Sequence, residues 1–414
     1  MSEKAPALPF SSYQKFVVII IALLQFTIVL DFMILSPLGD ILMKALSMTT
    51  KQFGSVVSAY AFSAGISGFL AAGFADKYDR KKLLLFFYVG FIAGTLFCGL
   101  ANTYESLLVA RILTGIFGGV IGSISMAIIT DIFSLQQRGR VMSFVQMAFA
   151  GSQILGIPIG LLLADKFSWH ATFFMVVILA IVIGAAIVLK LQPLTEHLKL
   201  QTNSNPLQHL WGTIKKRDYR TGYLATAMLS MGGFMLMPFT SAFIVNNVHI
   251  AQSELPIIFL FTGISSIIIM PVIGKLSDKI DKFKLFAIGS IVACVMIVIY
   301  TNLTPVPIWQ VIIVNVILFM GIMSRMVPAT ALNSAIPDMS DRGAYMSVNS
   351  SLQQVAGGLA AVFAGLVVVQ TTKTGPIEHF DTLGYVMVGF ILICLYLVYR
   401  VSELLKKREA TKTN

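Results

Sequence analysis

Three ionisable residues stand inside long apolar stretches of this 414-residue sequence, namely Asp31, Arg111 and Arg325. A charged side chain at mid-membrane costs about 2.5–3.5 kcal/mol on insertion scales, so it needs a partner or a water-filled cavity. A carboxylate there can bind and release a proton, whereas an arginine keeps its charge and can hold an anion. These residues therefore indicate proton or anion chemistry inside a membrane.

The positions of Asp31 and Arg111 suggest that the two side chains lie at one depth. Asp31 is 16 residues into the first apolar run, or about 24 Å at a rise of 1.5 Å per residue. Arg111 lies near the start of the fourth run, which crosses the membrane in the opposite direction, about 8 Å from the outer surface. In a core about 30 Å thick, it is therefore about 22 Å from the cytoplasmic surface. A pair, direct or through water, is possible if the two helices are neighbours. Asp31 would then carry a coupling proton while Arg111 tunes it or holds an anionic group; a permanent ion pair that fixes helix packing is the alternative.

The rest of the chain must be a membrane scaffold for these charges. Charged residues make up 12% of it, about half the share in soluble domains, and its mean hydropathy is +0.84. The runs are continuously apolar, which favours helices over a β-barrel, because the strands of a barrel alternate apolar and polar residues. We expect an all-α polytopic membrane protein with twelve transmembrane helices, without a cleavable signal because residues 1–14 are short and polar. The runs are 15–37, 53–75, 83–101, 106–131, 141–164, 170–190, 220–245, 254–276, 284–303, 308–334, 346–370 and 380–400.

The net charge of +11 reflects topology. With an N-terminus in the cytoplasm, 24 of the 30 Lys and Arg residues fall in cytoplasmic segments and four fall outside. Such a split is a strong positive-inside signal. Both termini are expected in the cytoplasm, the protein in the cell membrane (a bacterial inner membrane), and nucleic acid is not expected as a partner.

The two halves of the sequence repeat each other. The longest polar stretch, 191–219, separates an expected six-helix bundle of residues 1–190 from a second bundle and tail of residues 220–414. Asp76 and Asp278 are 202 residues apart, and the segments that begin at Arg138 and Arg342 are 204 apart. Two local matches at nearly one offset indicate a duplicated six-helix unit, a plan known from transporters.

The repeated loops resemble the cytoplasmic loop signature of the major facilitator superfamily, G-x-x-x-D-(R/K)-x-G-(R/K)-(R/K). The first copy departs from the pattern at Ala72 and Asp79, and the second keeps Gly274 but has Asp281. The resemblance implies two pseudo-symmetric bundles that rock about a central site. Loop carboxylates can cap helix ends and pair with basic residues of the neighbouring repeat, which would hold one face closed. Alternatively, the basic residues only keep the loops in the cytoplasm. The expected gating residues are Asp76, Asp79, Arg80, Arg138, Asp278, Asp281 and Arg342.

Three further segments resemble motifs of the drug:proton antiporter and sugar-efflux group. Leu30-Asp31 with Pro37 resembles the first-helix signature, and Arg111-x-x-x-Gly115 resembles the fourth-helix motif. A fifth-helix segment resembles the exporter motif, although an isoleucine separates its Gly-Pro pair. Its small residues serve as a hinge or seal, or only allow close packing. They are Gly151, Gly156, Pro158 and Gly160.

Polar side chains within spans are either cavity ligands or interhelical hydrogen bonds. Arg325 either binds an anionic substrate, snorkels towards the interface or pairs with Asp338. The candidate substrate-binding residues are Gln25, Asp31, Arg111, Gln146, Asn315, Arg325, Asn349 and Gln353, and Gln153, Asn333 and Gln354 are further polar span residues.

The function expected from these features is secondary active transport: proton-coupled efflux of a small amphipathic or drug-like molecule by alternating access. An importer or facilitator of sugars, organic anions or lipids is the alternative with the same fold. A receptor or a membrane enzyme fits less well, because the three cysteines and five histidines form no metal-site or catalytic spacing. No cofactor or metal is expected beyond the proton gradient, and the partners expected are a small-molecule substrate and the bilayer around a monomer.

Overall fold

A computed structural model describes residues 9–71, 74, 77–195, 198, 206–338, 341–372 and 374–413. Asp76 lies outside these ranges, and the side chains of Gln146 and Asp278 are also outside what is described.

Twelve helical segments of the described chain are long and apolar enough to cross a membrane, which confirms the expected all-α polytopic fold. Each expected run coincides with one span. Ten are single helices: α1 (Ser12–Ile34), α3 (Thr50–Ala71), α4 (Arg80–Leu100), α5 (Tyr104–Ile132), α8 (Trp169–Lys190), α12 (Leu255–Lys279), α13 (Lys282–Thr301), α14 (Ile308–Ser334), α15 (Arg342–Val367) and α16 (Phe380–Thr413).

The other two spans are interrupted. The fifth consists of α6 (Leu135–Gly151), a π-helical turn (Ser152–Gly156) and α7 (Ile157–Lys166). The seventh consists of α10 (Arg217–Phe234), a 3-10 turn (Met237–Phe239) and α11 (Thr240–Asn246). Proline stands near the start of α7 and in the 3-10 turn, and its missing N–H makes both places natural breaks in a helix.

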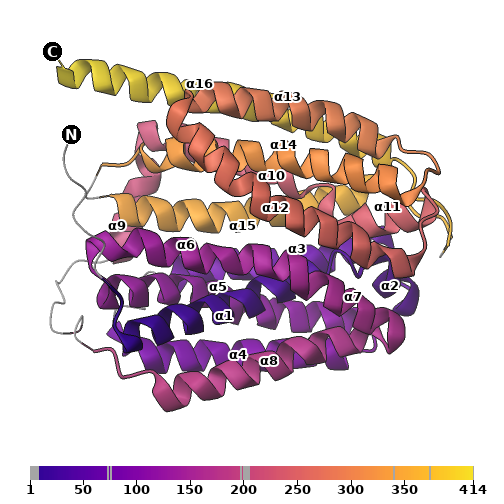
Figure 1. The fold of residues 1–414 in the computed structure, drawn as a ribbon, viewed down its shortest axis with the longest axis horizontal. Coiled ribbons are helices and arrows are strands. Elements are labelled where there is room, and N and C mark those ends of the chain that lie inside the picture. Colours follow the sequence, from indigo (N-terminus) through magenta and orange to yellow (C-terminus); the bar gives the residue numbers. More distant parts are fainter. Residues whose placement is uncertain are drawn as a thin grey trace.

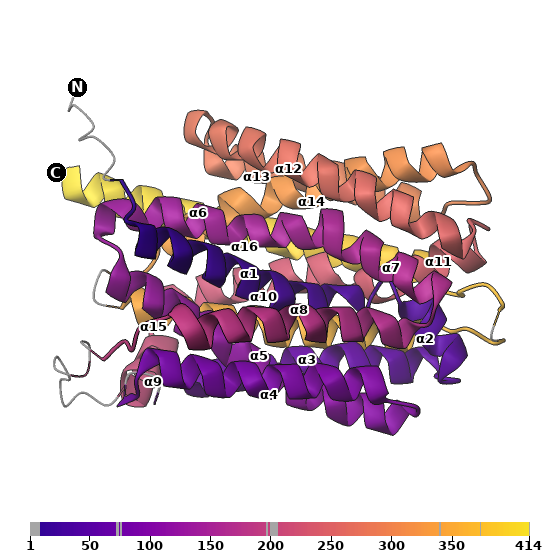
Figure 2. The same cartoon turned by 60° about the horizontal axis from the view of Figure 1, so that its bottom comes forward.

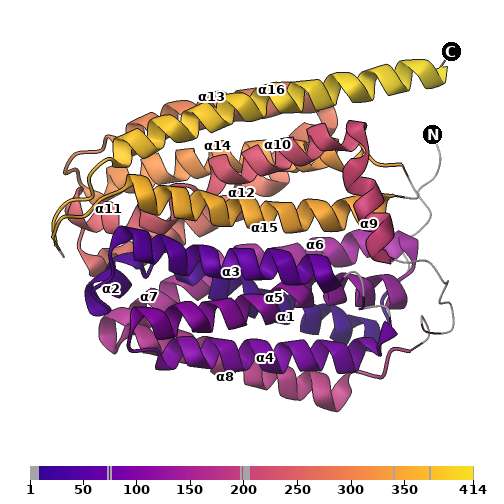
Figure 3. The same ribbon diagram turned by 180° about the vertical axis from the view of Figure 1, so that it is seen from behind.

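The helices form two groups that lie side by side (Figures 1 and 3). Helices α1–α8 pack among themselves, as do α10–α16. The stretch expected to be a polar linker contains a helix, α9 (Pro206–Lys215), and α10 already begins at Arg217. Leu210 of α9 is buried in a cluster with α10 and α15 residues, so an apolar face holds this helix against the second half.

The N-terminal end of α1 and the C-terminal end of α16 lie at the same end of the bundle, where α9 also lies (Figures 2 and 3). We name this end the terminal face, and the opposite end the far face. The far face carries a short helix, α2 (Gly39–Ala45), that was not expected from the sequence. It packs against α11, the equivalent element of the second half.

The halves meet along α3 against α15, and along α12 against α7 and the π turn. Glycines allow the first contact: a Cβ added to Gly54 would lie 2.7 Å from the carbonyl oxygen of Ala361 and 3.2 Å from Cα of Gly365. At the second contact, α12 diverges from α6 towards the terminal face (Figure 2). A Cβ added to Gly65 would lie 3.0 Å from the Ser351 carbonyl oxygen, so α3 and α15 stay in contact towards the terminal face, whereas α12 and α6 separate there.

Candidate functional site

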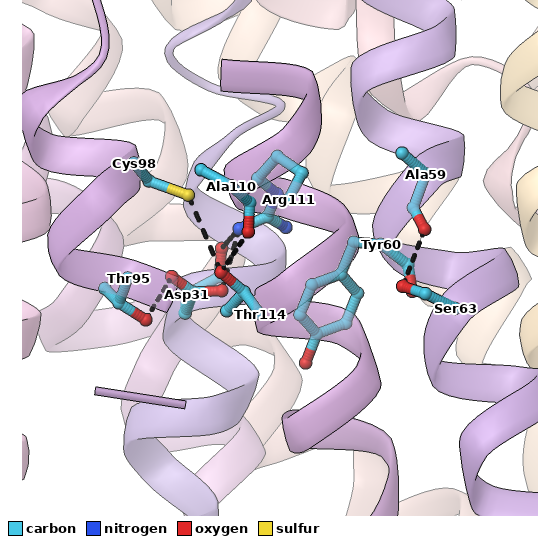
Figure 4. A network of polar contacts seen from close by, with 9 residues as sticks. All are labelled: Asp31, Ala59, Tyr60, Ser63, Thr95, Cys98, Ala110, Arg111 and Thr114. Atoms are coloured by element: carbon cyan, nitrogen blue, oxygen red, sulfur yellow. Dashed lines mark hydrogen bonds and ion pairs between the residues drawn. The ribbon is translucent and has the colours of Figure 1, made fainter. Parts of the chain in front are cut away.

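The deepest charges of the first half form one network, shown in Figure 4. Arg111 Nη1 donates to Asp31 Oδ2 at 2.7 Å, and Thr95 donates to Asp31 Oδ1 at 3.2 Å. The guanidinium also lies over the ring of Tyr60, 4.5 Å from its centroid. The structure thus brings together the two residues that the depth estimate placed at one level.

This network is sealed from solvent. The side chains of Asp31 and Arg111 are 0% and 1% exposed, and Arg111 Nε has no partner among the described atoms. A buried ion pair needs close geometry and additional hydrogen bonds to offset its desolvation. Loss of either charge would therefore leave the other uncompensated.

Close helix packing sets the geometry of the pair. Cβ added to Gly94 of α4 would come within 2.7 Å of the Thr114 hydroxyl of α5. The same addition at Gly115 would come within 2.5 Å of the Tyr60 carbonyl oxygen of α3. The glycine of the Arg111-x-x-x-Gly115 motif therefore brings α3 close enough for Tyr60 to cover the arginine.

A cavity lies between the two halves, and it is lined mainly by apolar side chains. Its empty space is about 1270 Å³, including the part that is open to solvent. Expected site residues on its wall are Asn315, Arg325 and Gln353. Polar residues are a minority of the lining, and most of the wall is apolar, including Met33, Phe149, Phe234, Phe259, Leu318, Phe319, Met323 and Met387.

Asp31 and Arg111 do not line this cavity, contrary to the expectation that both would contact substrate. Met33 of α1 does line it. Two residues correspond to about 200° around an α-helix, so Asp31 points away from the cavity and into the first half. The pair can act on the cavity only through helix movement, not by direct contact in this conformation.

Two other candidates are also away from the cavity wall. Gln25 is half-buried on α1. The Asn349 side chain accepts a 2.6 Å hydrogen bond from Thr226, which joins α15 to α10 within the second half. For Asn349, the interhelical role left open by the sequence is the one seen.

Polar contacts at the cavity wall tie its helices together. Asn315 donates to the Thr262 hydroxyl at 2.7 Å, and Ser266 donates to Gln153 Oε1 at 3.1 Å. The second bond crosses between the halves. Gln153 was only one of several polar span residues in the sequence and no particular role was predicted for it, although its place within the glycine-rich fifth-helix segment could have singled it out.

Gln153 lies in the π turn, and the expected hinge residues surround this turn. Gly151 precedes it, Gly156 ends it, and Pro158 and Gly160 follow in α7. A Cβ added to Gly156 would lie 2.5 Å from Leu30 Cδ1. Single π turns within helices often mark functional sites, and here the turn brings Gln153 to the contact with α12.

Arg325 is fully buried on α14 and has no acidic partner among the described residues. Its Nε donates to Ser290 at 3.2 Å, its guanidinium lies 5.5 Å from the centroid of the Phe286 ring, and Nη2 has no partner. Asp338, the expected alternative partner, instead accepts a hydrogen bond from Tyr219 at 3.3 Å. The snorkelling interpretation is also wrong, because no part of the side chain reaches solvent.

Contacts that close the far face were missed in the sequence. Asp40 pairs with Lys44 at 2.7 Å and accepts from Asn246 Nδ2 at 2.6 Å, which joins α2 to α11. Ser36 donates to the Met237 carbonyl, and Thr50 donates to the Val368 carbonyl at 2.7 Å. An i, i+4 Asp-Lys pair ordinarily indicates a solvated helix face, so the sequence concealed this contact between the halves.

The described gating candidates contact their own halves. Arg80 pairs with Asp131 at 3.2 Å, and Arg138 donates to the carbonyls of Phe133 and Thr130. Arg342 is exposed at the start of α15. The ion pairs described at the terminal face each join residues of one half, so none of these pairs holds the two halves together there.

Asp79 and Asp281 cap helices in equivalent positions of the two halves. Asp79 accepts from Lys81 N at 2.8 Å at the start of α4, and Asp281 accepts from Lys284 N at 3.0 Å at the start of α13. The backbone N–H of Lys284, and to a smaller degree Lys406, lower the pKa of Asp281. The repeated aspartates thus have a structural role that does not depend on gating.

Replacement Asp281→Ala is expected to lower stability by about 1 kcal/mol, the usual effect of losing a helix cap. Because the folded state lowers the pKa of Asp281, its stabilisation is complete above the ordinary pKa of 3.8 and disappears as the pH falls through the lowered value. Thermal unfolding of detergent-solubilised protein at pH 7 and at pH 3 measures this. A difference between wild type and variant that is as large at pH 3 would contradict the assignment.

No metal site emerges from the described ranges, in which no three His, Cys, Asp or Glu side chains gather closely enough to hold an ion.

Comparison with known sequences gives one family. The model described as Major Facilitator Superfamily matches residues 21–361 and, in a second match, residues 222–413. Two Bacillus subtilis (strain 168) proteins described as uncharacterized MFS-type transporters are similar: YceJ is 27% identical over 268 residues (64% of this chain and 67% of that protein), and YbcL is 24% identical over 388 residues (94% and 97%). Multidrug resistance protein 3 of the same organism is 35% identical over 100 residues, which is 24% of this chain and 20% of that protein.

Solved structures agree on the fold. A bacterial homolog of the human lysosomal transporter Spinster, in an inward-facing and unoccupied conformation, has a TM-score of 0.74 at 17% identity, covering 96% of this chain and 99% of its own. The D-xylose-proton symporter has a TM-score of 0.72 at 15% identity, covering 93% and 97%. At such identities the likeness concerns the fold alone.

Proposed function

Because this chain belongs to the major facilitator superfamily of membrane transporters, we propose that it is a proton-coupled antiporter that exports small amphipathic molecules. Proteins of this family move solutes and are not enzymes, so the remaining questions are the coupling ion, the direction and the substrate.

The observation that carries the proposal is the buried pair of Asp31 and Arg111. A carboxylate without solvent contact, held by an arginine and a threonine, can exchange a proton with water only when the pair opens. Burial opposes a carboxylate charge, while a nearby guanidinium favours it. Movement of α1 relative to α5 would change both the burial of Asp31 and its distance from the Arg111 guanidinium. Asp31 would then bind or release a proton at each conformational change.

The packing of the two halves supports a cavity that opens at the terminal face. The halves are held together at the far face by the contact of Asp40 with Asn246, while α12 diverges from α6 towards the terminal face (Figure 2). The excess of Lys and Arg in the terminal-face segments favours a cytoplasmic location for that face. With that orientation, the protein faces inward in the cell membrane and both termini lie in the cytoplasm. We propose that it acts as a monomer, because its own two halves enclose the cavity.

The wall of the cavity supports an amphipathic substrate. Ligand pockets are usually lined mainly by apolar side chains with a few polar groups, and the wall of this cavity includes five methionines and five aromatic residues. Methionine adapts to varied shapes, which suits substrates that differ in outline.

Transport by purified protein in liposomes tests the proposal. With an inward proton gradient imposed, a panel of drugs, sugars and amphiphiles is screened for movement against their own gradients and for dissipation of the proton gradient. We expect an apolar or amphipathic compound to move opposite to protons. Movement that ignores the proton gradient would instead identify a facilitator, and movement in the proton's direction would identify a symporter.

A further inference from the structure

We propose that Arg325 binds the anionic group of the transported molecule, so that the substrate is an amphipathic anion with its apolar body in the central cavity. This inference rests on the proposed transport function and adds the charge of the substrate.

The first step is the state of the guanidinium. Arg325 is 0% exposed and lies on the cavity wall, yet its Nη2 atom has no hydrogen-bond partner. Its neighbours are the Ser290 hydroxyl and the face of the Phe286 ring on α13, together with the thiols of Cys294 on α13 and Cys394 on α16, and none of these groups is a carboxylate. A buried charge of this kind is expected to be paired or to bind a ligand.

The second step is that the second half cannot neutralise this charge. The sequence has no acidic residue between Asp281 and Asp338, which covers all of α13 and α14. The acidic residues elsewhere in the second half stand near helix ends or in the terminal-face part of α16. The one acidic residue deep within a span is Asp31, and it is held by Arg111 in the other half.

The third step concerns the kind of anion. A guanidinium presents a planar set of donors that fits the two oxygens of a carboxylate, sulfonate or phosphate. The cavity beside it offers an apolar wall with few polar groups, so a small hydrophilic anion would lose hydration without compensation. A molecule with an apolar body and one anionic group would match both the apolar wall and the Arg325 guanidinium. A free organic acid and a single-chain anionic lipid both have this form.

Equilibrium binding to the purified full-length protein tests this charge preference. The probes are 1-naphthoate, 1-naphthylmethanol and 1-naphthylmethylamine, which share a ring and are respectively anionic, neutral and cationic at pH 7. We expect 1-naphthoate to bind at least about tenfold more tightly than the other two, equivalent to about 1.4 kcal/mol. Equal binding of the three probes would overturn the proposal.

Variants locate the effect. Arg325→Met is expected to abolish the preference for 1-naphthoate and Arg325→Lys to retain part of it, whereas Arg400→Gln, which removes an exposed guanidinium of α16, should leave binding unchanged. Arg325→Met is also expected to raise the unfolding temperature of the ligand-free protein, since it removes an unpaired buried charge. An anion preference that survives in folded Arg325→Met would refute the assignment.

The binding and transport measurements can reject the Arg325 site and the antiporter function independently of each other. Anion-selective binding without proton-linked transport would support the Arg325 site and reject the antiporter, whereas proton-linked transport of neutral or cationic compounds with no anion preference would do the reverse. Competition of 1-naphthoate by 1-oleoyl lysophosphatidate, compared with inorganic phosphate, separates a lipid source from a free anion. Displacement by lysophosphatidate alone assigns the site to a lipid-like anion, and displacement by phosphate alone would contradict the need for an apolar body.

Discussion

Asp31→Asn abolishes proton-driven transport, which is the largest functional loss expected from a single substitution in this protein. Asparagine keeps the size of the side chain and an oxygen that can accept from Thr95 or Arg111, both of which contact Asp31. It cannot bind and release a proton between pH 4 and pH 9. Uphill transport in liposomes should fall to background, while exchange of substrate between two sides at equal pH should persist.

The structure adds a stability effect to this prediction. In Asp31→Asn the guanidinium of Arg111 stays buried without a counter-charge, and breaking a buried pair in this way usually costs about 3–5 kcal/mol. The double variant Asp31→Asn with Arg111→Gln removes both charges and should recover most of the lost stability. Thermal unfolding of the purified variants measures this directly.

The double variant also separates the two interpretations of the pair. If the pair only fixes helix packing, transport should return together with stability. If Asp31 carries the proton, transport should remain absent in a protein that unfolds near the wild-type temperature. Normal uphill transport by the single variant would reject the proton-carrier role outright.

Gly54→Leu is expected to prevent closure of the far face and so to reduce transport at least about tenfold. A Cβ at Gly54 would already lie 2.7 Å from the Ala361 carbonyl oxygen, across the boundary between α3 and α15. Overpacking of this kind costs about 1–3 kcal/mol. Because the strain exists only when the halves touch here, it acts on one conformation and not on the folding of either half.

Thiol labelling of Met237→Cys reports this change, since Met237 lines the cavity next to the far-face contacts. In a background with the three native cysteines replaced, a membrane-impermeant reagent applied from the far face should label this position faster in Gly54→Leu than in its parent. Gly389→Leu is the matched control, because a Cβ there would meet no atom within 4 Å. Unchanged labelling with normal transport in Gly54→Leu would show that this contact does not separate during transport.

Several features of this protein were determined by its sequence alone. The apolar runs located all twelve spans, because a helix that crosses a bilayer must be long and apolar whatever its neighbours are. The similar depth of Asp31 and Arg111 followed from the helix rise and made a pair possible, and the structure shows the two side chains in contact at 2.7 Å. The offset of 202 residues marked Asp79 and Asp281 as equivalent positions, and both cap helices, although gating was the role expected of them.

Only the tertiary structure decided which way these side chains face. In a water-soluble protein, the polar face of a helix shows which side points to solvent. In a membrane helix the lipid-facing and the buried sides are both apolar, so the periodicity of the sequence says little about which side faces the protein interior. The sequence therefore could not tell that Asp31 turns away from the cavity while Arg325 stands on its wall without a counter-charge. Nor could it reveal that Asp40 meets Asn246, since that contact joins residues 206 positions apart and exists only because the two halves pack at the far face.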